Sequence, residues 1–260
     1  MKTVKTLFIA LLVLAISPLA TAQTAEEIVA NYFENTGGLD QWKNIESIKY
    51  VGSVDLGGMV IGFDRYVTAD GKSATIADVQ GQSFYQDVFD GEVLWGTNQM
   101  TMGTEKSDAE STANYKLEAD DLISPLLGYK EKGYTLELIG NETIEGTETL
   151  KVKLDMGTFM KDGVEQANVA YFYFETENYV PILEERMATS GQAKGYTLTF
   201  KYSDYQEANG LYFPFAMTQG VKEFPGEQTI TMTDIVVNGE IDNSIYAFPA
   251  PAATGTDGKN

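Results

Sequence analysis

The chain has 260 residues, with 18 Lys plus Arg against 38 Asp plus Glu, a formal net charge of −20, and neither His nor Cys. This charge repels nucleic acid, because nucleic-acid-binding proteins place Lys and Arg against phosphate. The missing residue types exclude Ser-His-Asp and Cys-His catalysis, zinc sites built from thiolate or imidazole, and disulfides, so that any metal would have to bind through oxygen ligands.

The first residues have the pattern of a secretory signal peptide over residues 1–22. Two lysines precede the apolar run 7–16, and the small residues 20–22 form a cleavage site ahead of Gln23. The apolar run is about half as long as a membrane-spanning helix, and Gln23 stands where a lipid-anchored protein would have Cys. We expect cleavage after Ala22 and a soluble, exported protein in the periplasm that does not span the membrane.

Two short helices are predicted at the start of the mature chain. Thr24 and Glu27 have the spacing of a capping box, in which each side chain satisfies a free backbone amide of the other. We expect a helix over 25–35 and a helical turn over 40–44, with Trp42 pointing inward. The apolar stripe of the first helix contains Ile28, Val29, Tyr32 and Phe33.

From Ile45 onward the apolar pattern changes to a period of two, which is typical of strands. In residues 196–202, aromatic and aliphatic side chains alternate with Thr and Lys, so one face of this strand should be buried and the other wet. The connections are short, which favours an antiparallel meander. The expected strands are 46–56, 59–68, 73–80, 83–89, 92–97, 133–139, 148–156, 168–175, 179–189, 195–203, 211–218 and 227–237.

One further helix is predicted over 117–128, between the strands. Its apolar stripe would contain Leu122, Ile123, Leu126 and Leu127, and Pro125 would kink or shorten it. The pattern leaves open whether this helix is a mobile lid or a fixed plug. The tail 249–260 is small, polar and aperiodic, so we expect it to be disordered.

The elements together indicate one folded domain over residues 23–248. The content of 43% hydrophobic and 12% aromatic residues is too high for a disordered chain, and no linker or internal repeat divides the sequence. A long antiparallel sheet with one apolar face and only two or three helices must curl in order to bury that face. We therefore predict a mainly β (α+β) fold.

Several short motifs follow one another along the chain: Gly37-Gly-Leu39, Ile48-Lys-Tyr-Val-Gly52, Phe89-Asp-Gly91 with Trp95, Gly128-Tyr-Lys-Glu-Lys-Gly-Tyr134, Tyr171-Phe-Tyr-Phe174, Tyr179-Val-Pro-Ile182, Tyr202-Ser-Asp-Tyr205, Gly210-Leu-Tyr-Phe-Pro214 and the stretch 241–249. In this order they resemble the outer-membrane lipoprotein-sorting proteins related to LolA and LolB, in a variant like that of Bacteroidetes-type bacteria. The resemblance implies an unclosed β-barrel, made of a single strongly curved antiparallel sheet covered by two or three helices. It also implies an apolar cavity that holds acyl chains in the periplasm, and a positively charged residue near that cavity.

The chain has only two arginines, and Arg65 is the more informative. Simple alternation along residues 59–67 places Arg65 on the apolar side of its strand, where an unpaired charge is costly. It is either a cavity-rim anchor for a carbonyl or phosphate group of a lipid, or an arginine that pairs with a neighbouring carboxylate or extends to the sheet edge. Arg186 lies beside Glu184 and Glu185, and charge pairing on a wet face explains it without a functional role.

The methionines and aromatics of the predicted strands are candidates for lining a cavity, because flexible Met suits adaptable apolar surfaces. Ordinary core packing is the alternative for each of them. Besides Arg65, the candidate ligand-binding residues are Met59, Ile61, Phe63, Phe84, Trp95, Met100, Met102, Leu122, Leu126, Leu198, Phe200 and Met232, with Phe215 as a further candidate.

Carboxylates cluster in several places, but 38 acidic residues make adjacency by chance expected. The sequence contains no EF-hand calcium loop, no Gly-x-Ser-x-Gly elbow and no Gly-rich phosphate loop. We therefore expect no catalytic residues, no metal and no cofactor.

Two functions fit these observations. The first is a periplasmic carrier or chaperone that binds the acyl chains of a lipoprotein or lipid and contributes to outer-membrane lipoprotein sorting. The second is a non-catalytic interaction module of the envelope on the same scaffold, with the cavity filled by side chains and a protein partner recognised by the acidic surface. In both cases we expect a monomer.

Overall fold

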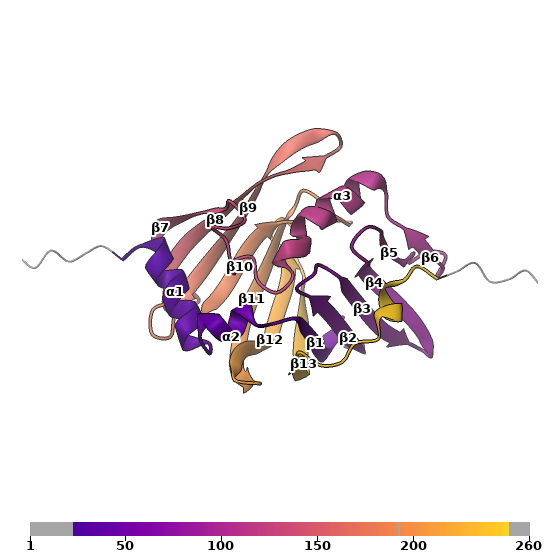
Figure 1. Ribbon diagram of the computed structural model, residues 1–260, viewed down its shortest axis with the longest axis horizontal. Helices are drawn as coiled ribbons and strands as arrows, with labels where there is room; N and C mark the ends of the chain where they lie inside the picture. Colours follow the sequence, from indigo (N-terminus) through magenta and orange to yellow (C-terminus); the bar gives the residue numbers. More distant parts are fainter. Residues whose placement is uncertain (1–22, 192, 250–260) are drawn as a thin grey trace, which may run out of the picture.

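This computed structural model describes residues 23–191 and 193–249 (Figure 1). The predicted signal peptide 1–22 and all but the first residue of the predicted disordered tail lie outside these ranges. Within them, no helix is both long and apolar enough to cross a membrane.

Thirteen strands form a single antiparallel sheet in the order β6-β5-β4-β3-β2-β1-β13-β12-β11-β10-β9-β8-β7. All twelve predicted strands are present, and the short exposed β6 is an addition that no apolar pattern announced. The strands are β1 (Ser47–Asp55), β2 (Val60–Thr68), β3 (Ser73–Val79), β4 (Gln82–Phe89), β5 (Leu94–Thr97), β6 (Thr104–Lys106), β7 (Thr135–Ile144), β8 (Thr147–Lys161), β9 (Val164–Glu175), β10 (Pro181–Met187), β11 (Thr197–Ala208), β12 (Leu211–Val221) and β13 (Glu227–Val237).

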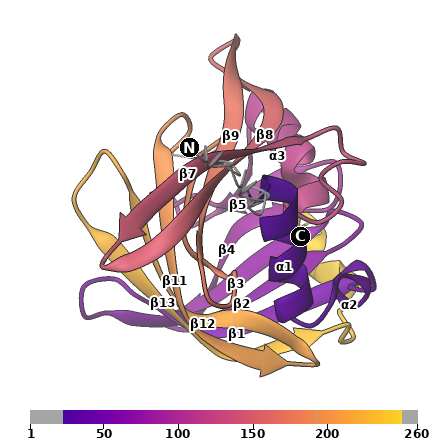
Figure 2. The same cartoon turned by 90° about the vertical axis from the view of Figure 1, so that its left-hand side faces the viewer.

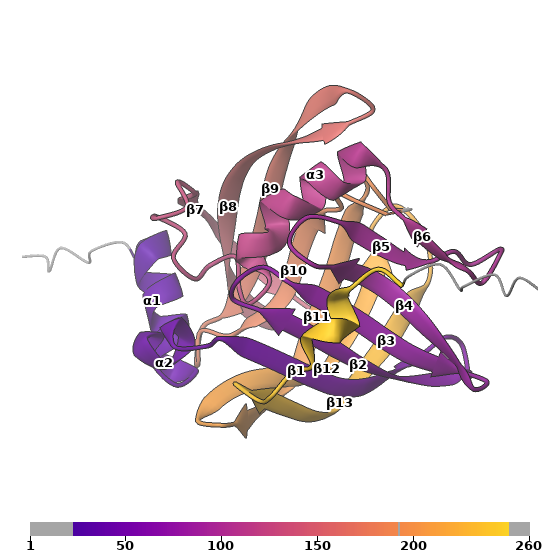
Figure 3. The same ribbon diagram turned by 45° about the vertical axis from the view of Figure 1, so that its right-hand side comes forward.

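The sheet consists of two meanders joined by antiparallel pairing of the first and last strands, β1 and β13. It curves strongly (Figure 2) but does not close, because β6 and β7 remain its two edges. The result is an unclosed β-barrel, as expected. The connection between β6 and β7 carries helix α3 (Ala109–Glu118), which contacts both β5 and β8 and so bridges the two halves of the sheet (Figures 1 and 3).

The two N-terminal helices are confirmed. Helix α1 (Ala25–Asn35) begins with the capping box of Thr24 and Glu27, and it buries its predicted apolar stripe. Helix α2 (Leu39–Lys43) buries Trp42, whose indole N–H donates to Thr36 Oγ1. Gly37 between the helices has a φ of 118° and approaches the backbone of the β11–β12 turn so closely that a side chain would clash with the Gly210 carbonyl.

The predicted helix over 117–128 is wrong in position. The helix lies earlier, at α3, where Asp108 caps the Ser111 amide, and it ends in the 3-10 turn η1 (Ala119–Asp121). Residues 122–128 form bends and turns instead, because Pro125 lacks an amide donor and restricts the residue before it. Their apolar side chains still pack inward, with Leu126 only 2% exposed, so the segment is a packed plug in this structure.

Buried side chains form clusters on both faces of the sheet. The largest cluster lies between the concave face and α1, α2 and the 122–134 segment, and a small one lies under α3 around Phe89 and Tyr115. Val88, adjacent to Phe89, points to the opposite face and packs with Trp95 and with Tyr246 of the 3-10 turn η2 (Asn243–Tyr246). The C-terminal segment therefore covers part of the convex face.

Candidate functional site

The pairing register identifies which side chains of the central strands lie on the concave face. Arg65 on β2 lies opposite Tyr50 on β1, and Tyr50 lies opposite Ile235 on β13. Ile235 and Val67 belong to the buried cluster under α1. Because side chains alternate along a strand, Arg65 shares the concave face with the other odd-numbered residues of β2, which include Ile61 and Phe63.

Beyond the packed cluster, the concave face carries a group of half-buried apolar side chains that we call the inner apolar surface. Phe63 pairs through Ala77 with Phe84 across three neighbouring strands, and Leu198 lies opposite Arg186 on the same face. None of the group joins a buried cluster, and each residue is only half-buried, so part of its apolar area stays exposed. The inner apolar surface consists of Ile61, Phe63, Phe84, Leu198 and Met217.

Four of these five residues were candidates from sequence, and the other candidates lie elsewhere. Phe200 is buried beside Leu198, and Met232 and Phe215 pack at the border of the main cluster, in which Leu126 is buried and against which Leu122 packs. Four candidates are remote from the concave face or open to solvent. Trp95 is buried on the convex face, while Met59, Met100 and Met102 are 54%, 92% and 46% exposed on hairpin connections.

Arg65 makes one side-chain hydrogen bond. Its Nη1 donates to Thr75 Oγ1 on β3 over 3.0 Å. No carboxylate lies within ion-pairing distance of Arg65 among residues 23–191 and 193–249, so the paired alternative considered from sequence is not observed. The guanidinium keeps most of its donors for another group.

Arg186 does not lie on a wet outer face, contrary to expectation. Its register partners Ala170 and Leu198 place it on the concave side, where its guanidinium carbon lies 4.7 Å from the centroid of the Phe200 ring. The side chain is 44% exposed, and its Nε lies 3.6 Å from Oε1 of Glu184, which is beyond hydrogen-bonding distance. Sequence reasoning missed this position because Glu184 and Glu185 directly precede it, and two adjacent acids hide which face of the strand is buried.

Glu184 is buried next to Arg186, with a side chain that is 8% exposed. Its Oε2 accepts a hydrogen bond from the Tyr202 hydroxyl over 2.6 Å, while its Oε1 is buried without a hydrogen-bond partner in the described part of the chain. Burial, and then the Glu184 carboxylate, raise the pKa of Tyr202, so this hydroxyl stays protonated and acts as a donor.

Glu118 approaches the same region from the end of α3. Its Oε1 accepts a hydrogen bond from Thr189 Oγ1 over 2.6 Å. Burial raises the pKa of Glu118 above its ordinary value, while the charge of Arg186 and the Thr189 hydroxyl partly oppose that rise. We call Arg186, Glu184, Tyr202 and Glu118 the inner polar group.

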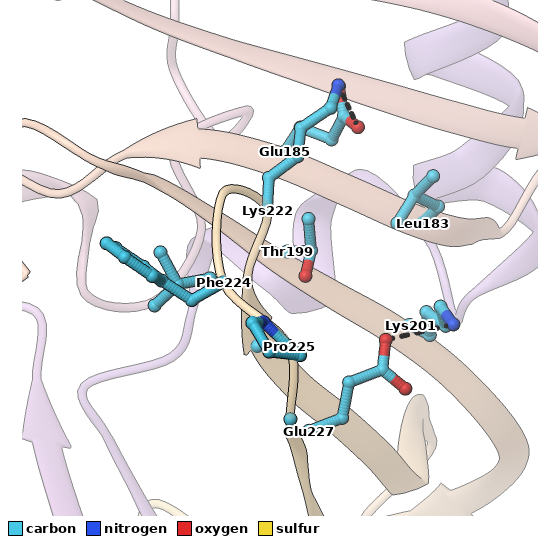
Figure 4. A pocket seen from close by; sticks show the side chains of 11 residues that line it. Leu183, Glu185, Thr199, Lys201, Lys222, Phe224, Pro225 and Glu227 are labelled. Carbon is cyan, nitrogen blue, oxygen red and sulfur yellow. Dashed lines mark hydrogen bonds and ion pairs between the residues drawn. The ribbon is translucent and has the colours of Figure 1, made fainter.

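The convex face has a different character. A depression of about 560 Å³ lies over β10, β11 and β12 and the β12–β13 turn, and charged side chains line much of it (Figure 4). Its lysines are paired, Lys222 with Glu185 over 2.7 Å and Lys201 with Glu227 over 3.0 Å. A depression lined by paired charges is a poor place for an acyl chain, which makes the concave face the better candidate site.

Solved structures of similar fold come from several bacteria. A DUF1329 family protein from Desulfovibrio piger superposes with a TM-score of 0.52 at 12% identity, over 87% of this chain and 98% of that one. A LolA superfamily protein from Nitrosomonas europaea gives a TM-score of 0.51 at 14% identity, over 87% and 99%. The chain has the LolA fold. A putative outer membrane lipoprotein-sorting protein domain from Vibrio parahaemolyticus gives 0.51 at 8% identity, over 84% and 94%.

Sequence comparison adds nothing to this likeness. No family model matches the chain, and no curated protein matches it. Sequence identities of 8–14% together with these TM-scores show a shared fold and do not show a shared function.

Proposed function

We propose that this protein is an exported carrier that binds the acyl chains of a lipid or lipoprotein on the concave face of its sheet, in the periplasm, and that it performs no catalysis. The observation that carries the proposal is the inner apolar surface, whose side chains are half-buried yet belong to no packed cluster. Apolar area left uncovered in this way gains about 25 cal/mol per Å² when a ligand covers it.

Arg65 adds a polar anchor to this apolar surface. It lies on the same face of β2 as Ile61 and Phe63, and its only hydrogen-bond partner among the described residues is Thr75. An acyl chain seated on the inner apolar surface would bring its carbonyl or phosphate group within reach of a guanidinium, which binds oxygen acceptors with charge-assisted hydrogen bonds. The similar fold of the putative outer membrane lipoprotein-sorting protein domain from Vibrio parahaemolyticus supports the same class of cargo.

The carrier function is tested by recovering lipid from the purified protein and by measuring the binding of a fatty acid. The full chain is expressed with its leader in a bacterium, and the exported protein is purified, extracted with organic solvent and examined by mass spectrometry. The extracted protein is then titrated with a fluorescent fatty acid. We expect co-purified lipid and saturable binding at one site per chain. Finding neither would reject the carrier.

An envelope interaction module is the second candidate, and the convex face favours it. Phe224 and Tyr196 are 54% and 39% exposed, and their rings contact each other at 5.1 Å between centroids. Exposed aromatic pairs are common at protein interfaces. If the titration shows no lipid binding, replacement of Phe224 by Ser and recovery of envelope proteins by crosslinking would test this second function.

A further inference from the structure

The inner polar group holds two unused binding functions side by side. The Arg186 guanidinium, a fork of five N–H donors, donates no hydrogen bond to any residue within 23–191 and 193–249. Beside it, Glu184 Oε1 is buried without a hydrogen-bond partner. A buried carboxylate oxygen without a hydrogen bond costs free energy, and the ion pair with Arg186 at 3.6 Å offsets only part of that cost.

Arg186 and Glu184 form an ion pair but no hydrogen bond. Arg186 stacks on Phe200, and this contact holds its Nε 3.6 Å from Glu184 Oε1. Glu184 is fixed from the other side by the short hydrogen bond from Tyr202. The pair therefore places unused guanidinium donors next to a buried carboxylate oxygen that accepts no hydrogen bond, on the face that carries Leu198 and the rest of the inner apolar surface.

The charges around this pair indicate what would fill it. Glu118 is a second carboxylate whose charge acts on Arg186, so the region has two acids around this one guanidinium. An anionic group alone would suit Arg186 but would face Glu184 and Glu118. A group that brings a small cation together with an anion suits all three.

From this arrangement we propose that the inner polar group binds a zwitterionic headgroup with a primary ammonium, the anionic oxygens bonding to Arg186 and the ammonium donating to Glu184 Oε1. This inference rests on the proposed carrier function and names its ligand class as an amphiphile of the ethanolamine phosphate type. A quaternary ammonium would not fit as well, because it has no N–H to donate to the open oxygen.

The test compares lysophospholipids that share one acyl chain and differ in the head: ethanolamine, choline and glycerol phosphates. Each competes with the fluorescent fatty acid for the delipidated protein. We expect the ethanolamine form to bind about tenfold more tightly than the other two, which is the effect of one charge-assisted hydrogen bond. Equal affinities for the three heads would overturn the inference while leaving the carrier function intact, and failure of the fatty acid itself to bind would reject both.

Variants assign the preference to the named atoms. Glu184→Gln keeps an acceptor for Tyr202 but removes the charge, so the ethanolamine form should fall to the affinity of the choline form. Glu185→Gln is the matched control, because Glu185 is the next residue, points to the convex face and pairs there with Lys222; its preference should equal that of wild type. A preference that survives Glu184→Gln would overturn the inference.

Arg186→Met provides a second route if Glu184→Gln fails to fold. This change removes the cation beside the buried Glu184 carboxylate, so the variant should be less stable than wild type, and its binding is measured below its own melting temperature. All three phosphate heads should then bind about tenfold more weakly, while the affinity for an uncharged monoacylglycerol stays the same. An unchanged ratio between the phosphate heads and the monoacylglycerol would contradict the assignment of Arg186.

Discussion

Arg65 and Thr75 are joined by a hydrogen bond of 3.0 Å between neighbouring strands, and no acid takes the place of the threonine. A guanidinium on the apolar side of a sheet usually neutralises a carboxylate, because an unpaired charge there is expensive. Here the partner is a neutral hydroxyl, so loss of Arg65 leaves no orphaned acid behind. This separates the contribution of Arg65 to the fold from its contribution to binding.

Arg65→Leu should therefore leave stability within about 1 kcal/mol of wild type, because an apolar side chain is acceptable on this face and Thr75 can be hydrated. Its affinity for the fluorescent fatty acid should fall by about 1.5–3 kcal/mol, the range for hydrogen bonds to a charged group. Urea unfolding and titration on the same sample measure both effects. A variant that is destabilised by 3 kcal/mol or more, yet binds normally when folded, would show an undetected structural pairing.

The sheet was predictable because its signal is local. In the first half of β11, Leu198, Phe200 and Tyr202 alternate with Thr and Lys. Alternation alone assigns the faces correctly for Ile61, Phe63 and Arg65 as well. The α3 helix was not predictable in the same way. Its mean hydropathy is low and its capping residue Asp108 is one acid among many, whereas the strongly apolar residues 122–127 pack as turns whose shape depends on tertiary contacts.

The candidate site was predictable only where the alternation within a single strand determines which face a side chain lies on. Alternation along β2 and along residues 196–202 predicts that Ile61, Phe63 and Leu198 each share a face with other apolar residues, and the pairing register agrees. That these residues bind a ligand stays a prediction. Trp95 was misassigned because its short strand offers no alternation, and the C-terminal segment that buries it on the convex face is distant in sequence. The missing hydrogen bond at Glu184 Oε1 depends on how side chains of neighbouring strands pack in space, which a sequence pattern does not show.

The two faces of the sheet predict opposite consequences for two aromatic residues. Phe63→Ala removes part of the inner apolar surface, so fatty-acid affinity should fall about five- to tenfold at a stability cost of about 1–2 kcal/mol. Trp95→Leu removes a buried side chain and its hydrogen bond to the Tyr246 carbonyl on the convex face, which should cost about 3 kcal/mol or more without changing affinity. Thermal melts and fatty-acid titrations of both variants test these two expectations. If Trp95→Leu weakens binding and Phe63→Ala does not, the binding surface lies on the convex face instead.

Glu118 should make stability depend on pH. Because burial raises its folded-state pKa above the ordinary value of 4.5, the folded protein holds this proton more tightly than the unfolded chain. The resulting stabilisation is present below the ordinary pKa and is lost as the pH rises through the raised one. Glu118→Gln resembles the protonated form and keeps the acceptor for Thr189. The variant should therefore melt like wild type at about pH 4 and above wild type at about pH 7.5. If the difference in melting temperature between Glu118→Gln and wild type is the same at both pH values, Glu118 is not the group responsible.

An ion pair connects the residues on either side of the plug, which is formed by residues 122–128. Lys132 Nζ lies 2.7 Å from Asp121 Oδ1, the two side chains are 19% and 11% exposed, and Asp121 Oδ2 also accepts a hydrogen bond from the Tyr134 hydroxyl. Burial raises the pKa of Asp121, and Lys132 opposes that rise, so removal of the lysine leaves a largely buried acid with only one partner. Lys132→Met should cost about 2–4 kcal/mol at neutral pH, somewhat less than a fully buried pair.

Adding Asp121→Asn to Lys132→Met should recover part of the lost stability, because the orphaned charge is then gone. The matched control is Lys72→Met. Lys72 Nζ lies 2.8 Å from Asp70 Oδ2, but the Asp70 side chain is 63% exposed, so this variant should cost no more than about 1 kcal/mol. Urea unfolding of the two single variants and the double variant measures the coupling directly. If Lys132→Met costs no more than Lys72→Met, the segment that carries Leu126 is held by its apolar contacts alone, and the ion pair has no part in fixing the plug against the concave face.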